Sequence, residues 1–240
     1  MHTQAARLSH SSNVFYNPWA TSLAELLITL TQQEGGLGWA PGTLPPLGIA
    51  PDDRTHPSLA PKGGAKVFFA NTGTEANEGA IKVARKVGKE RWSASHGGRS
   101  WEDALDKGEF SKFRFACFEN AFHGRSMGSL SATSNPKYQK PFAPMVPGFD
   151  VGKVNDFEGL ERLVTEDTCG VLVEPIQGEG GIFAVDPEWL RALRKRCDEV
   201  GAVLIYDEIQ VRLICIVGLG TLIGCSLILL LSLDVIVRTV

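Results

Sequence analysis

The sequence predicts an α/β fold with a mostly parallel sheet and flanking helices. Residues 171–173 and 203–206 are short, apolar and rich in β-branched or aliphatic side chains, as buried strands of a parallel sheet are. The segment between them has helical spacing, and such strand–helix–strand units are right-handed almost without exception. The two runs end in carboxylates, Glu174 and Asp207. Because ligands of open α/β sheets lie beyond the carboxyl ends of the strands, these two acids mark a candidate site.

The helix between these strands has clear start and stop signals. Asp186 suits the N-cap position, Pro187 the first helical position and Gly201 the C-terminal cap. The apolar positions that would pack on the sheet are Trp189, Leu193, Cys197 and Val200.

The composition indicates a substantial core and gives no sign of a nucleic-acid partner. Of the 240 residues, 43% are hydrophobic, which suits one domain or part of a larger one. The formal net charge is −3 and no basic run occurs, so the charge pattern does not favour DNA or RNA. Five widely spaced cysteines without a C-x-x-C pair argue against a disulfide framework or a zinc site and favour a reducing compartment.

The N-terminal part contains one predicted helix and a long irregular stretch. Ser22 and Glu25 have capping-box spacing, which predicts a helix start there. One face of that helix would carry Leu23, Leu26, Leu27 and Leu30. Residues 33–64 are rich in Gly and Pro, and we interpret them as a surface excursion. Residues 1–7 lack the apolar stretch of a secretory signal and hold one arginine, too few for a transit peptide.

A candidate phosphate site follows the predicted strand 66–70. Thr72 and Glu75 have capping-box spacing and predict a helix that continues to about Val87. Gly73 and Thr74 would then lie in its first turn, with free backbone N–H groups at the positive end of the helix dipole. A strand, a glycine turn and a helix N-terminus together can bind phosphate, although many such turns bind nothing. The P-loop motif is absent.

A second candidate site follows the predicted strand 113–118. Phe122 and Arg125 could stack on a ring and hold a carboxylate. Core packing is the alternative for Phe122, and a polar loop role is the favoured interpretation of His123. We predict a loop over 88–112, with one helical turn near 101–107, and a turn-rich segment over 131–149.

Four motifs in this order resemble the class III pyridoxal-phosphate aminotransferases. They are Asn71-Thr-Gly-Thr-Glu-Ala-Asn77, Phe122-His-Gly-Arg125, Val173-Glu-Pro-Ile-Gln-Gly-Glu-Gly-Gly181 and Asp207-Glu-Ile-Gln210. The resemblance covers about residues 5–210 and is strongest to the acetylornithine type, although ornithine and 4-aminobutyrate members share most of these motifs. It implies the type I aminotransferase fold, of which residues 65–210 would form an incomplete large domain with a seven-stranded sheet.

The resemblance implies pyridoxal 5′-phosphate as the cofactor and assigns five residues to it. Gly73 and Thr74 would bind its phosphate, and Phe122 would stack on its pyridine ring. Asp207 would pair with the protonated ring nitrogen, which keeps the ring an electron sink. Gln210 would bind the 3′-oxygen.

The resemblance also implies substrate-binding residues, partners and a compartment. Arg125 would bind the α-carboxylate, and Glu179 would act as a gate opposite a second arginine. Glu174 would contact residues of the site rather than the cofactor or substrate. The alternative is that Glu174 and Glu208 are exposed or structurally bonded acids at the edge of the sheet. Family members are homodimers that act on amino acids and 2-oxo acids, here N-acetylornithine and 2-oxoglutarate in arginine biosynthesis. The compartment implied is the mitochondrial matrix, with the cytoplasm as the alternative.

The sequence departs from the family pattern after Gln210. The family continues with Thr-Gly-x-Gly-Arg and a strand that leads to the Schiff-base lysine, whereas this chain continues with Val211 and Arg212. Lys195 is its last lysine, so the resemblance assigns no catalytic residue and implies an inactive chain. Strand 203–206 would also lack its later neighbours and be a pairing hazard.

The tail, residues 211–240, supports two interpretations. Residues 213–233 carry no charge and are long enough for a transmembrane helix. However, the tail starts directly after a motif residue, and Val211-Arg212 can be encoded by codons that match a 5′ splice site. We therefore favour translated intron sequence over a membrane anchor.

Three functional hypotheses follow. The first is an acetylornithine-type aminotransferase sequence in truncated form. The second is a non-catalytic protein tethered to a membrane by its tail. The third is a lysine-less pseudoenzyme that binds pyridoxal phosphate or a partner subunit.

Overall fold

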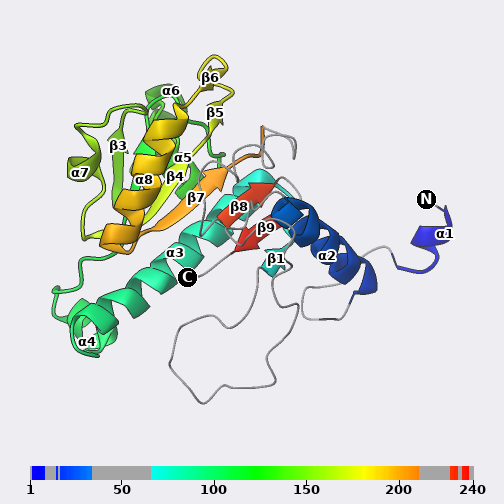
Figure 1. The fold of residues 1–240 in the computed structure, drawn as a ribbon, viewed down its shortest axis with the longest axis horizontal. Coiled ribbons are helices and arrows are strands. Elements are labelled where there is room, and N and C mark those ends of the chain that lie inside the picture. Colours follow the sequence, from blue (N-terminus) through cyan, green and yellow to red (C-terminus); the bar gives the residue numbers. More distant parts are fainter. Residues whose placement is uncertain are drawn as a thin grey trace.

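A seven-stranded sheet forms the centre of the molecule (Figure 1). The computed structural model describes residues 2–8, 15, 17–33, 66–210, 228–231 and 234–237. The strand order is β1-β9-β8-β7-β4-β2-β3. The strands are β1 (Lys66–Phe68), β2 (Arg114–Phe118), β3 (Phe149–Gly152), β4 (Thr168–Val173), β7 (Val203–Asp207), β8 (Ile228–Leu231) and β9 (Asp234–Val237). Neighbours from β3 to β8 pair in parallel, and β9 pairs antiparallel with both β8 and β1, so the predicted mostly parallel sheet is confirmed.

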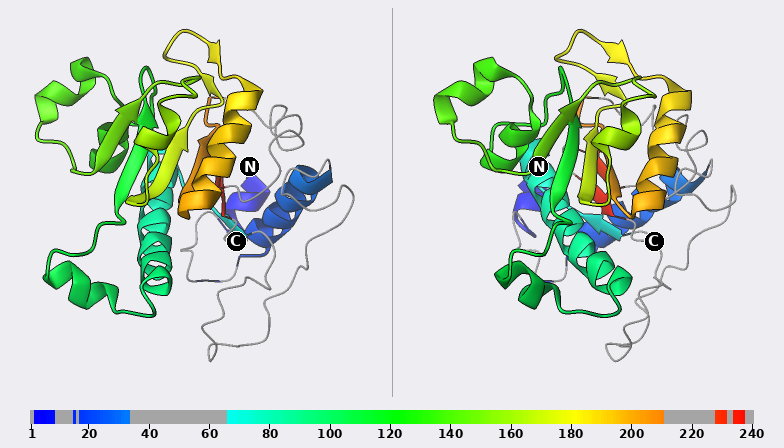
Figure 2. Two further views of the ribbon diagram at one scale, coloured as in Figure 1. Left: turned by 60° about the vertical axis from the view of Figure 1, so that its left-hand side comes forward. Right: turned by 90° about the vertical axis from the view of Figure 1, so that its left-hand side faces the viewer.

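Helices cover both faces of this sheet (Figure 2). Val171 and Leu204 pack on one face with residues of α8, while Leu172 and Ile205 pack on the other face with residues of α3. All four side chains have no exposed surface, as expected of parallel strands between two helical layers. The helices are α1 (His2–Ala5), α2 (Pro18–Gln33), α3 (Gly73–Ser95), α4 (Trp101–Asp106), α5 (Met127–Ala132), α6 (Pro136–Gln139), α7 (Leu160–Leu163) and α8 (Pro187–Val200), with a 3₁₀ turn, η1 (Lys140–Phe142). The short strands β5 (Ile176–Gln177) and β6 (Phe183–Ala184) form a separate hairpin.

The predicted caps of α8 are confirmed. The Asp186 carboxylate accepts a hydrogen bond from the Glu188 N–H at 2.8 Å, and Pro187 is the first helical residue. Gly201 ends the helix in the left-handed conformation at φ 65°, which a residue with a side chain adopts only at a cost. The four predicted sheet-facing side chains of α8 are buried, so this helix packs as its spacing indicates.

Helix α3 is longer than predicted. The glycine at position 88 suggested a loop, but the helix runs through it to Ser95. A Cβ at Gly88 would lie 2.6 Å from the Cβ of Cys169, so glycine lets α3 approach β4 closely. Trp92 anchors the last turns, because it is buried and packs edge-on against Phe110 with ring centroids 5.6 Å apart. The predicted loop is therefore wrong over 88–95, whereas the helical turn near 101–107 is present as α4.

Helix α2 starts one turn earlier than predicted. Its first residue is Pro18, and the Asn17 side chain accepts a hydrogen bond from the Trp19 N–H at 3.0 Å. An asparagine cap followed by proline sets the start, and Ser22 lies inside the helix. Its buried residues are Leu27 and Ile28, while Leu23 and Leu26 are exposed, so the predicted apolar face is only partly right. The predicted surface excursion began at Gln33, which is the last residue of α2, and its residues 34–64 lie outside the described residues.

Two segments of the tail are part of the sheet. β8 pairs in parallel with β7, so β7 is not the unpaired edge strand that the sequence suggested. β8 also replaces the end of the predicted transmembrane segment, so a continuous helix over 213–233 is wrong at 228–231. Residues 211–227 lie outside the described residues. Within the described ranges no helix has the length and apolar character needed to cross a membrane.

Candidate cofactor site

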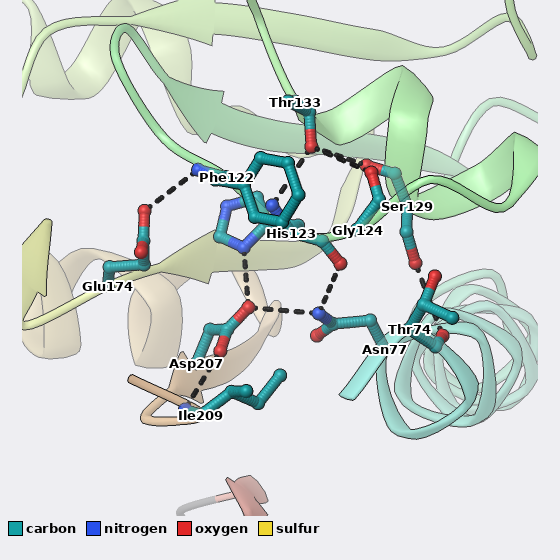
Figure 3. Close-up of polar contacts among 10 residues, drawn as sticks. All are labelled: Thr74, Asn77, Phe122, His123, Gly124, Ser129, Thr133, Glu174, Asp207 and Ile209. Carbon is teal, nitrogen blue, oxygen red and sulfur yellow. Dashed lines mark hydrogen bonds and ion pairs between the residues drawn. The ribbon is translucent and has the colours of Figure 1, made fainter. Parts of the chain in front are cut away.

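Asp207 lies at the carboxyl end of β7 and has three hydrogen-bond donors (Figure 3). Its Oδ2 atom lies 2.8 Å from Nδ1 of His123 and 2.9 Å from Nδ2 of Asn77. Its Oδ1 atom accepts from the Ile209 N–H at 3.2 Å. Asp207 is only 4% exposed, so these donors replace the water that a carboxylate needs. The carboxylate is therefore fixed in one orientation.

His123 lies in the loop after β2 and is a partner of Asp207. It is 1% exposed, and because an ionised carboxylate only accepts, Nδ1 of His123 is the donor in this contact. Its backbone is held as well: the N–H donates to Thr133 Oγ1 at 2.9 Å, and the carbonyl accepts from Asn77 Nδ2 at 2.7 Å. His123 is therefore a hydrogen-bonded polar residue of the loop after β2, which agrees with the favoured interpretation from sequence, and β2 directs this loop onto the end of β7.

Sequence reasoning missed Asn77. The residue belongs to the first motif, but only its neighbours were assigned roles. Asn77 is fully buried and lies among the buried alanines of α3, Ala76 and Ala80. A polar residue within an apolar helix face needs buried partners, and that pattern is the signal that could have identified it.

The N-terminus of α3 faces the same end of the sheet. Thr72 caps the helix by accepting the Glu75 N–H at 3.2 Å, and the Glu75 carboxylate accepts the Asn71 N–H at 2.8 Å. Within residues 66–210 and the other described segments, the N–H groups of Gly73 and Thr74 have no acceptor. Two donors are thus available at the positive end of a 23-residue helix.

Two glycines allow the first, second and fourth motifs to come into contact. A Cβ at Gly73 would lie 2.4 Å from Cδ1 of Ile209, so the start of α3 packs directly against the residues after Asp207. A Cβ at Gly124 would lie 2.5 Å from Oγ1 of Thr74, and the backbone of Gly124 has φ 124°. Residues 122–125 therefore lie against the same helix start, as Figure 3 shows for Gly124 and Thr74.

Glu174 and Glu208 are buried acids, so exposed positions at the sheet edge are ruled out for both. Glu174 is 2% exposed and accepts the Phe122 N–H at 2.9 Å. Burial raises its pKa to about 7. Glu208 is 3% exposed, and burial together with the neighbouring Asp207 raises its pKa to about 8. Glu174 thus supports the loop that carries Phe122.

The predicted substrate-binding residues are more exposed. Arg125 is exposed, and its Cζ lies 4.3 Å from the ring centroid of Tyr138 and 5.7 Å from that of Phe122. Phe122 is half-buried and meets Tyr138 edge-on at 5.9 Å. Glu179 is exposed in the turn between β5 and β6, and no ion pair among the described residues joins it to Arg125. Sequence reasoning gave Tyr138 no role.

Gln210 lies at the rim of the site. It is exposed, and a Cβ at Gly178 would come within 3.5 Å of its Cβ and Cγ atoms. The last residue of the fourth motif therefore lies beside the third motif. All four motifs meet at the carboxyl ends of β2, β4 and β7.

The residues present fit a phosphorylated aromatic cofactor with a basic ring nitrogen. A carboxylate has about four lone-pair positions, and three of those on Asp207 are used. One acceptor position thus remains on Oδ1, in a buried site where an opposite charge would be strongly favoured. The free N–H groups of Gly73 and Thr74 suit a phosphate, and the Phe122 ring is available for stacking.

Comparison with known proteins agrees with this chemistry. Residues 1–213 match the class III aminotransferase family. The chain is 50% identical over 207 residues to a mitochondrial acetylornithine aminotransferase of Neurospora crassa, and 39% identical over 207 residues to an acetylornithine aminotransferase of Aquifex aeolicus. Each alignment covers 86% of this chain but only 36% and 43% of the relative, so the chain spans about two-fifths of their length.

Solved structures show the same fold. An ornithine aminotransferase of Toxoplasma gondii superposes with a TM-score of 0.66 at 22% identity. The superposed region covers 98% of this chain and 48% of the Toxoplasma chain. An aminotransferase of Bacillus anthracis superposes with a TM-score of 0.67 at 20% identity, over 99% of this chain and 50% of the Bacillus chain. With residues 1–213 matched, this chain belongs to the class III aminotransferases, a family of transferases that depend on pyridoxal 5′-phosphate.

Proposed function

We propose that this chain forms the cofactor-binding part of an aminotransferase of the acetylornithine type. One observation carries the proposal: the start of α3 and the carboxylate of Asp207 belong to one site, because Ile209 packs against Gly73. A phosphate at the helix and a ring nitrogen at the carboxylate are the two ends of pyridoxal phosphate. A site for phosphate alone would not need a buried acid, which repels anions.

The cofactor would be held by five residues. Gly73 and Thr74 bind the phosphate through backbone N–H groups and Phe122 stacks on the ring. Asp207 keeps the ring nitrogen protonated, and Gln210 binds the 3′-oxygen from the rim. When bound, the cofactor supplies an electron sink for the carbon that loses or gains the amino group.

The substrates would be bound by the exposed residues. The Arg125 guanidinium suits an α-carboxylate, because its N–H groups form a planar fork. The Cζ of the same guanidinium lies over the Tyr138 ring, 4.3 Å from its centroid, and this contact would limit its motion. Glu179 would gate the approach of the second substrate. The names of the fungal relatives favour acetylornithine as the amino donor and the mitochondrion as the compartment. The amino acceptor proposed from the motif resemblance is 2-oxoglutarate, and ornithine and 4-aminobutyrate are the alternative amino donors.

The 240-residue chain itself would have no useful transaminase activity. It contains no lysine after Lys195, which lies on the exposed side of α8 with 81% of its side chain accessible. Without a lysine in the site, both nucleophilic catalysis and the positioned base for proton transfer are missing. Several orders of magnitude in rate depend on these two functions.

The sequence after Gln210 would differ in the complete enzyme, because the tail is proposed to be translated intron sequence. The family match ends at residue 213, close to this point. Sequencing of mature transcripts across codon 210 tests this. A majority that continues with Thr-Gly-x-Gly-Arg and a downstream lysine would support it, and a majority that encodes Val-Arg-Leu-Ile-Cys would overturn it. The complete enzyme is expected to be a homodimer.

The proposed function of the chain is tested with two assays on the pure 240-residue protein. Pyridoxamine phosphate should bind saturably, as measured by equilibrium dialysis, because this form of the cofactor needs no lysine. Amino transfer from N-acetylornithine to 2-oxoglutarate should not exceed the blank. A chain that binds no cofactor would contradict the assigned site, and measurable transfer would contradict the proposed inactivity.

A further inference from the structure

Asn77 links the two ends of the cofactor site. We infer that Asn77 is a positioning residue, which holds the carboxylate of Asp207 at a fixed place relative to the phosphate-binding start of α3. The inference rests on the proposed function, and it concerns a residue to which that proposal assigns no cofactor contact.

Both N–H groups of the Asn77 amide are used. One donates to Asp207 Oδ2 at 2.9 Å and the other to the carbonyl of His123 at 2.7 Å. Figure 3 shows Asn77 and His123 approaching Asp207 from different elements, α3 and the loop after β2. One buried amide therefore connects α3, the loop that carries Phe122 and Arg125, and the end of β7.

The contacts with Asn77 and His123 leave one oxygen of Asp207 for the cofactor. Oδ2 receives both of these donors, whereas Oδ1 receives only the Ile209 N–H. An oxygen of a carboxylate accepts about two hydrogen bonds, so Oδ1 keeps one position. Without Asn77 the carboxylate would be held only by the His123 ring and the Ile209 N–H, and its position relative to α3 would no longer be fixed by a direct bond. Asn77, together with His123, thus keeps Oδ2 occupied and leaves Oδ1 to meet the ring nitrogen.

The position of Asn77 in α3 explains how this contact can link the two ends of the site. It lies one turn after Gly73 and Thr74 on the same rigid helix, and a turn advances about 5.4 Å. The phosphate end and the ring end of the site are thereby set from one element. The Asn77 Oδ1 atom is buried and has no partner among the described residues, which costs stability that an apolar residue would not. Stability alone therefore does not account for an asparagine here.

Two ligands separate a positioning role from a merely structural one. Pyridoxamine phosphate has the ring nitrogen that meets Asp207, and its 1-deaza analogue has a carbon at that place. Titration calorimetry with the 240-residue chain would compare their affinities. Asn77→Leu should weaken pyridoxamine phosphate about tenfold to a hundredfold, the range for a hydrogen bond to a charged group, and should change the deaza analogue less than about threefold.

A second variant and a control complete the test. Asn77→Ala also removes the donor without adding a charge, and it should give the same selective loss if Asn77→Leu fails to fold. Gln177→Leu is the matched control, because Gln177 is an equally buried amide that donates to the Glu119 carbonyl at 2.9 Å and has no bond to Asp207. It should shift both affinities equally. Thermal unfolding by circular dichroism checks that each variant is folded.

The outcomes separate the inference from the proposed function. Equal weakening of both ligands in folded Asn77 variants would overturn the positioning role and leave the cofactor site intact. If the unsubstituted chain binds neither ligand, the proposed function fails, and the inference fails with it. A loss confined to pyridoxamine phosphate supports both.

Discussion

The inner and outer halves of the site are held in different ways. In the inner half, Asp207 and its partners Asn77 and His123 are nearly inaccessible and joined by hydrogen bonds of 2.7–2.9 Å. In the outer half, Arg125 rests on aromatic rings, and Glu179 and Gln210 are exposed. The side chains of the inner half are therefore held in one arrangement, whereas those of the outer half can change rotamer.

This difference separates cofactor binding from substrate choice. A buried hydrogen-bond network favours one arrangement, because every broken bond leaves an unpaired polar group in a dry site. Exposed side chains lose little when they move, since water replaces their partners. In the proposed assignment the inner half would bind the cofactor, whereas substrate choice would depend on the exposed side chains of the outer half.

The largest effect is expected for Asp207→Ala. The substitution leaves the His123 ring and the Asn77 amide without their shared acceptor, and each buried donor left unpaired costs about 1 to 3 kcal/mol. Unfolding in urea should show this loss, and pyridoxamine phosphate should bind at least about a hundredfold more weakly. The exposed acid Glu179 provides the matched control, because Glu179→Ala should change neither quantity measurably.

The next effect is a pH dependence of stability from Glu208. Its pKa is about 8 in the folded chain against an ordinary value of 4.5, so between these values the folded chain holds a proton that the unfolded chain has lost. The free energy of unfolding therefore falls as pH rises from 4.5 to 8, by on the order of 3 kcal/mol. Glu208→Gln should flatten this slope in urea unfolding between pH 5 and 8. A slope that is unchanged in the variant would assign the pH dependence to other groups.

A smaller effect is expected where the two ends of the site touch. Gly73→Ala places a methyl group 2.4 Å from Cδ1 of Ile209, so Ile209 must move. Overpacking of this kind costs about 1 to 2 kcal/mol. Inorganic phosphate should then compete less well with pyridoxamine phosphate for the site. Gly79→Ala in the same helix has open space around it and serves as the control.

The smallest effect is expected in the outer half. Tyr138→Leu removes the ring under Arg125, whose cation–π energy is about 0.5 to 1 kcal/mol at an exposed site. The test ligand is glutarate, an unreactive dicarboxylate, added to the chain already loaded with pyridoxamine phosphate. Its affinity should fall only a few-fold. Tyr138→Phe keeps the ring and should retain the affinity. A larger loss in Tyr138→Leu would show that the outer half is as rigidly held as the inner half.

The fold could be predicted where local signals and packing agree. The caps at Asp186 and Gly201 and the apolar spacing between them gave the correct helix, because each signal is confined to a few residues. At Gly88 a local signal for a break is overridden by the close approach to Cys169. The short strand β3 was missed, since it follows a segment with four prolines and pairs only with β2.

The candidate site shows the same limit. The strand ends and the order of the motifs indicated Glu174 and Asp207, because sheet topology brings carboxyl ends together. The bonds from Asn77 and His123 to Asp207 join residues 130 and 84 positions apart in the chain. No local pattern encodes such a contact. Only the packing of α3 and the loop after β2 onto β7 creates it.

The most direct test of the central assignment is the protonation of the cofactor ring nitrogen. The ¹⁵N chemical shift of pyridoxamine phosphate labelled at that nitrogen would be followed with pH, free and bound to the 240-residue chain. If Asp207 pairs with the ring nitrogen, the bound signal stays that of a protonated ring above the pH at which the free cofactor loses its proton, and Asp207→Asn abolishes this difference. A bound ring nitrogen that titrates like the free one would contradict the account.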